Sequence, residues 1–213
     1  MAVPGAPKVL GIDPGLTRCG LGIVVGPSAR PSTPFFDCIR TSTDLPLEQR
    51  LLRVHDAIVE AIEAHRPDAV AVERVLFSVN VRTAMATGQA AGVALVAAAR
   101  AGIEVRAYSP SDVKLTVAGA GDADKDAVAR LVTAQLGLDA PPRPADVADA
   151  LAVALTHLTR SRMSALAAAS PAASALAEAE ASARTSARGG WQAHLAARGM
   201  LPETSTPTKG HRK

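Results

Sequence analysis

Residues 8–25, KVLGIDPGLTRCGLGIVV, constrain the fold more than any other part of the chain. They contain two runs rich in Val, Leu and Ile, separated by Pro14-Gly15. Branched apolar residues favour strands, and a Pro-Gly pair marks a turn. The pattern therefore predicts a β-hairpin whose first strand ends at Asp13.

Predicted strands and helices alternate after this hairpin. Apolar residues spaced three and four apart from Leu47 to Ile62 predict an amphipathic helix that ends at Arg66-Pro67. Short apolar runs predict strands at 35–40, 68–73 and 103–107, and helices are expected at 80–100, 110–115, 124–136 and 144–159. A hairpin followed by such alternation predicts an α/β domain with a mixed β-sheet flanked by helices.

The chain changes character near residue 160. It carries 16 Lys and Arg against 17 Asp and Glu through Arg160, but 7 against 3 from Ser161 onward, so the net charge of +3 comes from the last part. That part is rich in Ala and Ser and has too little apolar bulk to offset its ordering entropy. We expect a folded domain over 8–160 and a mobile basic tail over 161–213.

Composition excludes several classes of protein. No apolar run approaches the roughly 20 residues that cross a bilayer, and the first residues do not resemble a secretory signal, so we expect a cytoplasmic protein with no membrane partner. Two cysteines, Cys19 and Cys38, are too few for a disulfide framework or a cysteine-based zinc site. Alanine supplies 45 of the 213 residues, so the core is smaller than the 48% hydrophobic content suggests.

Four carboxylates stand where stability alone would not place them. Asp13 and Glu73 each end an apolar strand, and Asp146 and Asp149 lie three apart on the last predicted helix. Side chains at strand ends of an α/β sheet face a shared crevice. If the last helix packs across that edge, all four carboxylates converge.

Converging carboxylates repel each other and resist desolvation unless a cation lies among them. Hard oxygen donors without His or Cys suit Mg²⁺, with Mn²⁺ as a substitute, and two such ions about 4 Å apart can activate water against a phosphodiester. The predicted chemistry is metal-dependent phosphodiester hydrolysis. Taken singly, Asp13 also fits a turn residue, Asp146 a first-turn carboxylate, and Glu73 a partner for Arg74 or Arg82.

Several motifs together resemble the RuvC family of bacterial Holliday-junction resolvases. They are GIDPGLTRCGLGIV, AVERVLFSVN, GQAAGVALVAAA, SPSDVKLTVAGAGDADKDAV and PADVADALAVALTH, in order from about residue 8 to 160. The resemblance implies a ribonuclease H-like fold, a homodimer, and paired nicks on opposed strands of a four-way DNA junction. It also implies two Mg²⁺ per active site and the RuvA–RuvB branch-migration complex as a partner.

The resemblance also assigns roles to residues. It implies that Asp13, Glu73, Asp146 and Asp149 are the catalytic metal ligands and that Lys114 and Lys125 lie near the scissile phosphate. Where the family commonly has an aromatic wedge, this chain has Leu76 followed by Phe77, so either residue is a candidate wedge. Arg74 and Arg82 flank this loop and are further candidates for DNA contacts.

The predicted helix over 80–100 carries a face of small residues followed by Leu95 and Ala99. The small residues are Ala84, Gly88, Ala91 and Gly92. Such a face permits close packing against another helix, which is the role of this helix in dimers of the resembling family. The alternative is packing against its own sheet.

Two other functions compete with the resolvase. Asp13-x-Gly15 followed by Thr17 also resembles a phosphate loop of actin-like ATPases and sugar kinases, although those proteins need a second such loop and a second domain. A junction-binding protein that has lost cleavage is disfavoured, because all four carboxylates are present.

Overall fold

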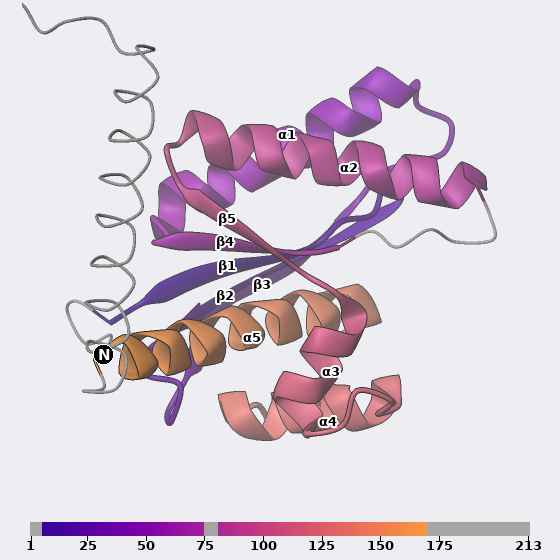
Figure 1. Ribbon diagram of the computed structural model, residues 1–213. Helices are drawn as coiled ribbons and strands as arrows, with labels where there is room; N and C mark the ends of the chain where they lie inside the picture. The colour runs from indigo at the N-terminus through magenta and orange to yellow at the C-terminus, as the bar shows by residue number, and fades with distance from the viewer. Residues whose placement is uncertain (1–5, 75–80, 170–213) are drawn as a thin grey trace, which may run out of the picture. The chain divides into compact units, whose positions relative to one another are not determined.

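A computed structural model describes residues 6–74 and 81–169 of the chain. Five strands form one mixed sheet in the order β3-β2-β1-β4-β5 (Figure 1). The strands are β1 (Lys8–Asp13), β2 (Arg18–Val25), β3 (Ser32–Arg40), β4 (Ala69–Glu73) and β5 (Glu104–Tyr108). β1 pairs antiparallel with β2, which pairs antiparallel with β3, whereas β4 is parallel to both β1 and β5. The predicted hairpin and mixed sheet are confirmed.

Helices cover both faces of the sheet. They are α1 (Leu47–His65), α2 (Val81–Arg100), α3 (Pro110–Ala118), α4 (Lys125–Leu136) and α5 (Ala145–Ala168). α1 and α2 lie on one face, and α3, α4 and α5 lie on the other (Figure 1). Alternate strand residues lie on opposite faces of the sheet and form two hydrophobic cores. Leu10 and Ile12 pack with α1 and α2, whereas Val9 and Val24 pack with α5.

α5 crosses β1 and β2 at very short range because glycines lie beneath it. A Cβ added to Gly20 would lie 1.9 Å from the carbonyl oxygen of Asp146, and one added to Gly11 would lie 2.0 Å from that of Ala150. These distances leave no room for a side chain. The glycines therefore set how closely the first turns of α5 approach the end of β1.

Several element boundaries differ from the prediction. α5 continues to Ala168, past the expected end at 159, because alanine has the highest helix propensity and residues 161–168 include three of them. α3 runs to Ala118 instead of 115, where Gly119 adopts the left-handed conformation that ends a helix. The chain divides into two units, Met1–Met163 and Ser164–Lys213, and the predicted mobility of the tail concerns mainly residues outside the described ranges.

Two expectations about composition can be compared with the structure. Cys19 is buried and Cys38 is half-buried, and both are free thiols. Among the described residues, no helix is both long and apolar enough to cross a bilayer.

Candidate active site

Asp13 and Glu73 lie side by side at one edge of the sheet. They end β1 and β4, which are parallel neighbours with Ile12 opposite Val72. The carboxyl ends of parallel strands meet at the same edge, so the two side chains share the crevice predicted there. The two carboxyl groups are close enough that Glu73 raises the pKa of Asp13 through its negative charge.

Asp146 and Asp149 reach the same edge from the first turns of α5. Gly20 lies directly opposite Asp13 in the β1–β2 ladder, and the backbone of Asp146 lies against Gly20. Asp146 and Asp149 both raise the pKa of Asp13 through their negative charge. The structure therefore brings together all four carboxylates singled out in the sequence, while their roles remain a prediction.

The electrostatics of this carboxylate cluster oppose full ionisation. Burial raises the pKa of Asp13 to about 8, with further contributions from the charges of Glu73, Asp149 and Asp146. Burial, followed by the charge of Asp149, also raises the pKa of Glu73. Proximity of like charges in a poorly hydrated site favours the neutral acid. A cation bound among the carboxylates would relieve the same repulsion.

Two basic side chains supply positive charge at the cluster. Arg18 Nε lies 2.9 Å from Asp146 Oδ2, and Lys125 Nζ lies 3.2 Å from Asp149 Oδ2. The resemblance assigned Lys125 to this region, whereas sequence reasoning missed Arg18. Its position at the start of β2, two residues before Gly20, could have indicated it, because the hairpin places that position near the Asp13 edge.

The carboxylate cluster fits a metal ion in its chemistry. Within residues 6–74 and 81–169, no three His, Cys, Asp or Glu side chains are already arranged to hold one. However, the donors are all carboxylates, they repel each other, and two of them are neutralised by Arg18 and Lys125. Such a donor set suits Mg²⁺ or Mn²⁺ once Asp146 and Asp149 turn away from their basic partners.

The raised pKa of Asp13 predicts a pH-dependent stability in metal-free protein. Its pKa rises from an ordinary 3.8 to about 8, so between those values the unfolded chain releases a proton that the folded protein keeps. Folding is therefore weakened as pH rises. In EDTA, urea unfolding should show a loss of more than about 1 kcal/mol between about pH 5 and pH 8 that Asp13→Asn lacks. An identical pH dependence in both proteins would contradict this assignment.

Of the alternative roles given above for Asp146 and Glu73, the structure supports only that of Asp146. Asp146 does lie in the first turn of α5, but it is also paired with Arg18. Among the described residues, no ion pair joins Glu73 to Arg74 or Arg82. Arg74 instead donates from Nη2 to the carbonyl oxygen of Ala107 at 3.4 Å.

The remaining candidate DNA contacts are spread over the domain. Lys114 is half-buried on α3, and no hydrogen bond or ion pair joins it to another described residue. Arg82 lines a cavity of about 490 Å³ between the β1–β2 turn and α2, which also reaches Asp146. Leu76 and Phe77 lie outside the described residues, so the choice of wedge stays a prediction.

The family profile described as "Crossover junction endodeoxyribonuclease RuvC" matches residues 9–157, which include all four carboxylates and the whole sheet except Lys8. The chain belongs to the RuvC family. A RuvC protein from Salinispora arenicola is 53% identical over 165 residues, covering 75% of this chain and 94% of that relative. The members of the RuvC family are nucleases that act at crossover junctions.

Solved structures agree with the family and the fold. RuvC of Thermus thermophilus, solved in complex with a Holliday junction substrate, matches with a TM-score of 0.72 and 42% identity over 74% of this chain and 96% of that chain. The yeast mitochondrial Holliday junction resolvase Ydc2 matches with a TM-score of 0.52 at 13% identity over 71% and 79% of the two chains, which supports the fold alone. The predicted ribonuclease H-like fold is confirmed, as is the RuvC resemblance.

Proposed function

We propose that this chain resolves four-way DNA junctions by paired, Mg²⁺-dependent nicks on opposed strands. The observation that carries the proposal is the convergence of four carboxylates, from β1, β4 and α5, in a protein of the RuvC family. The Thermus relative with a junction substrate supports the choice of DNA.

Each residue of the site has a chemical task under this proposal. Asp13 and Glu73 on the sheet edge and Asp146 and Asp149 on α5 would hold two Mg²⁺ ions, which activate a water and stabilise the leaving oxygen. Asp13 and Glu73 are fixed by their strands, so they define where the phosphate is cleaved. Asp149 raises the pKa of Lys125, which keeps this amine charged beside the site, where it can bind the negatively charged phosphate.

The competing functions are weaker on the same observations. The chain aligns with 94% of the length of the Salinispora relative. Its described part shows one sheet instead of the two similar domains of an actin-like ATPase or sugar kinase. A junction-binding protein without cleavage would have no need for four half-buried carboxylates that converge at one edge of the sheet. We also propose the RuvA–RuvB complex as a partner, on family membership alone.

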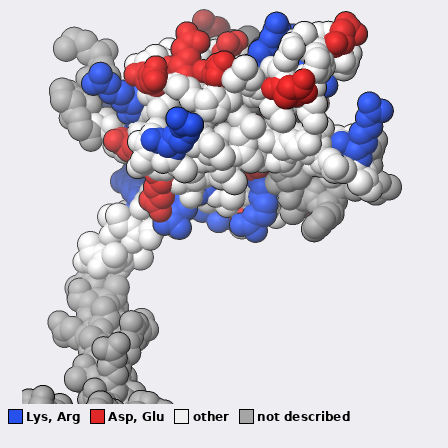
Figure 2. All heavy atoms as spheres, turned by 90° about the horizontal axis from the view of Figure 1, so that it is seen from above, with Lys and Arg blue, Asp and Glu red and all other residues white. Residues whose placement is uncertain are grey.

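A homodimer through α2 is part of the proposal. Only two charged residues, Arg82 and Arg100, occur on α2, and Figure 2 shows a broad uncharged area on the face that carries α1 and α2. Gly88 and Gly92 have open space where a Cβ would be, and Leu95 and Val96 are 46% and 54% exposed. Open glycines and exposed apolar side chains on one helix suit close packing against a second copy.

The proposed α2 interface predicts that one introduced negative charge will disrupt the dimer. Val96→Glu is expected to convert the dimer into monomers, because burying an unpaired carboxylate at an interface costs several kcal/mol. Sedimentation velocity measures the change directly. Leu52→Glu on α1, at a position that is 57% exposed, is the matched control and should leave the dimer intact. Equal sedimentation of both variants would contradict the α2 interface.

A synthetic four-way junction tests the proposed function. With Mg²⁺, the protein should cut two opposed strands of the junction and leave a linear duplex of the same sequence intact. With EDTA in place of Mg²⁺, it should bind the junction without cutting it. Equal cutting of junction and duplex, or cutting in EDTA, would contradict the proposal.

A further inference from the structure

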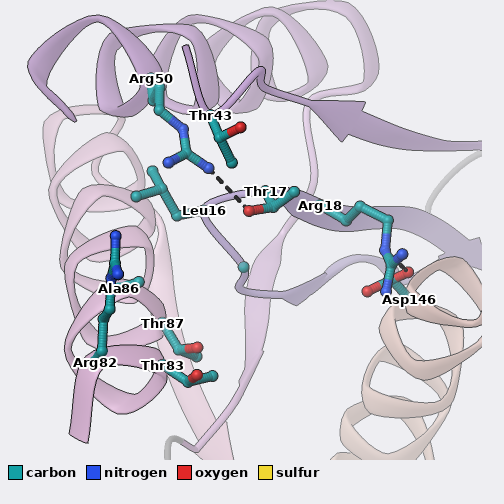
Figure 3. Close-up of a pocket in the computed structure, with 11 residues that line it drawn as sticks. Leu16, Thr17, Arg18, Thr43, Arg50, Arg82, Thr83, Ala86, Thr87 and Asp146 are labelled. Carbon is teal, nitrogen blue, oxygen red and sulfur yellow. Dashed lines mark hydrogen bonds and ion pairs between the residues drawn. The ribbon is translucent and has the colours of Figure 1, made fainter. Parts of the chain in front are cut away.

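The cavity of about 490 Å³ beside the carboxylate cluster has a lining unlike that of the cluster. Its walls are the β1–β2 turn, the start of α1 and the first turns of α2 (Figure 3). Among the described residues that line it, the polar ones are arginines and threonines, namely Thr17, Arg18, Thr43, Arg50, Arg82, Thr83 and Thr87, and the one acid is Asp146. With three guanidinium groups and one carboxylate, the cavity carries net positive charge.

Arg50 is held in this cavity without an acidic partner among the described residues. Its Nε donates to Thr41 Oγ1 and its Nη2 to Thr17 Oγ1, both at 2.9 Å. Figure 3 shows the guanidinium reaching from α1 toward the β1–β2 turn. Two hydroxyls fix the direction of the side chain and leave its charge uncompensated. A fixed, uncompensated guanidinium is a preorganised anion-binding group.

Arg82 stands on the opposite wall, on the first turn of α2, beside Thr83, Ala86 and Thr87 (Figure 3). It is exposed, and no ion pair joins it to another described residue. Arg18, the third arginine, already pairs with Asp146 and marks the boundary between the cavity and the carboxylate cluster. Arg50 and Arg82 are therefore the charges available to a ligand.

An apolar groove of about 670 Å³ adjoins the cavity and shares Leu16, Arg50, Arg82 and Ala86 with it. The further residues of this groove are Leu45, Leu47, Val81, Met85 and Gln89. An anion-binding cavity next to an apolar wall matches a nucleotide, whose phosphate is charged and whose sugar and base are not. Free inorganic phosphate would use only the first of these surfaces.

We propose that Arg50 and Arg82 bind one backbone phosphate of the junction DNA in this cavity, separate from the phosphate that is cleaved at the carboxylate cluster. The inference rests on the proposed function, since it assumes junction DNA as the ligand. This contact would fix the register of the bound DNA strand, because phosphate contacts position DNA without reading its sequence.

Binding to junctions with one neutral phosphate tests the proposal. Each junction carries a single methylphosphonate, and binding is measured in EDTA to prevent cutting. Arg82→Gln should weaken binding to the unmodified junction about 5- to 10-fold at about 0.1 M salt and lower the salt slope by about 0.9. A methylphosphonate at one position away from the scissile bond should weaken binding by the wild type but not by Arg82→Gln. Arg100→Gln, at the other end of α2, is the matched control and should behave as the wild type.

Each other outcome overturns a stated part of the proposal. Equal effects of Arg82→Gln and Arg100→Gln would remove the cavity from DNA binding. If a methylphosphonate at every position weakens binding by Arg82→Gln as much as binding by the wild type, Arg82 binds none of these phosphates. If the position that affects only the wild type is the scissile phosphate, the cavity is part of the active site. If Arg82→Gln instead dissociates the dimer, a second copy occupies the cavity. Failure of the wild type to bind the junction would overturn the proposed function itself.

Discussion

Asp13→Asn is expected to abolish junction cleavage while leaving the protein folded and able to bind its junction. Loss of a metal ligand removes several kcal/mol of transition-state stabilisation, and each 1.36 kcal/mol is a factor of ten, so the rate should fall about 1,000-fold or more. In EDTA above about pH 5, the variant should be at least as stable as the wild type, because burial and three carboxylates oppose ionisation of Asp13. Single-turnover cleavage and urea unfolding measure the two effects.

This combination separates a catalytic role from a structural one. A turn residue replaced by its amide would lose stability or change nothing, whereas a metal ligand loses activity without losing stability. Asp139→Asn is the matched control, since Asp139 is exposed in a loop and has no hydrogen bond or ion pair within the described part of the chain. Cleavage by Asp13→Asn at the rate of this control would remove Asp13 from the active site.

Gly20→Ala is expected to damage both the stability and the active site, although Gly20 carries no functional group. The new Cβ would lie 1.9 Å from the carbonyl oxygen of Asp146, so α5 or β2 must move. Overpacking of this kind costs about 1–3 kcal/mol, and backbone on both sides of the contact leaves little room for relaxation. Displacement of α5 also moves Asp146 and Asp149 away from Asp13. Because misplacing catalytic groups by about 1 Å can lower a rate about 100-fold, we expect a loss of that size in the cleavage rate.

The matched control is Gly121→Ala. A Cβ at Gly121 meets only Ser111 O at 3.8 Å, an ordinary contact, so stability and cleavage should stay near wild type. Urea unfolding and single-turnover cleavage are measured for both variants. If Gly20→Ala unfolds at the same urea concentration as Gly121→Ala, the close approach of α5 to β2 is wrong.

Much of this site could be predicted because local sequence patterns indicate where its residues lie on strands and helices. Asp13 and Glu73 each follow an apolar strand, and parallel strands bring such ends together. Asp146 and Asp149 follow a helical spacing that places them near one face. Bringing the four carboxylates together requires two long-range contacts, the parallel pairing of β1 with β4 and the packing of α5 across the sheet edge, and the structure contains both.

The parts that could not be predicted depend on tertiary packing. The predicted hairpin places Arg18 near the Asp13 edge, but its pairing with Asp146 arises only where β2 and α5 meet, which no local pattern indicates. The same holds for Arg50, whose hydroxyl partners lie on the β1–β2 turn and after β3. The Ala/Ser composition predicts mobility after residue 160, whereas α5 continues to Ala168 because helix propensity governs residues 161–168.

Metal ions held by the carboxylate cluster should contact the phosphate that is cut. Replacing a non-bridging oxygen of the scissile phosphate with sulfur and comparing cleavage in Mg²⁺ and Mn²⁺ tests this contact. Sulfur is a poor ligand for Mg²⁺ and a better one for the softer Mn²⁺. We predict that the substituted junction is cut slowly in Mg²⁺ and that Mn²⁺ restores cutting by the wild type but not by Asp13→Asn. The same slowing by sulfur in both metals would contradict the account.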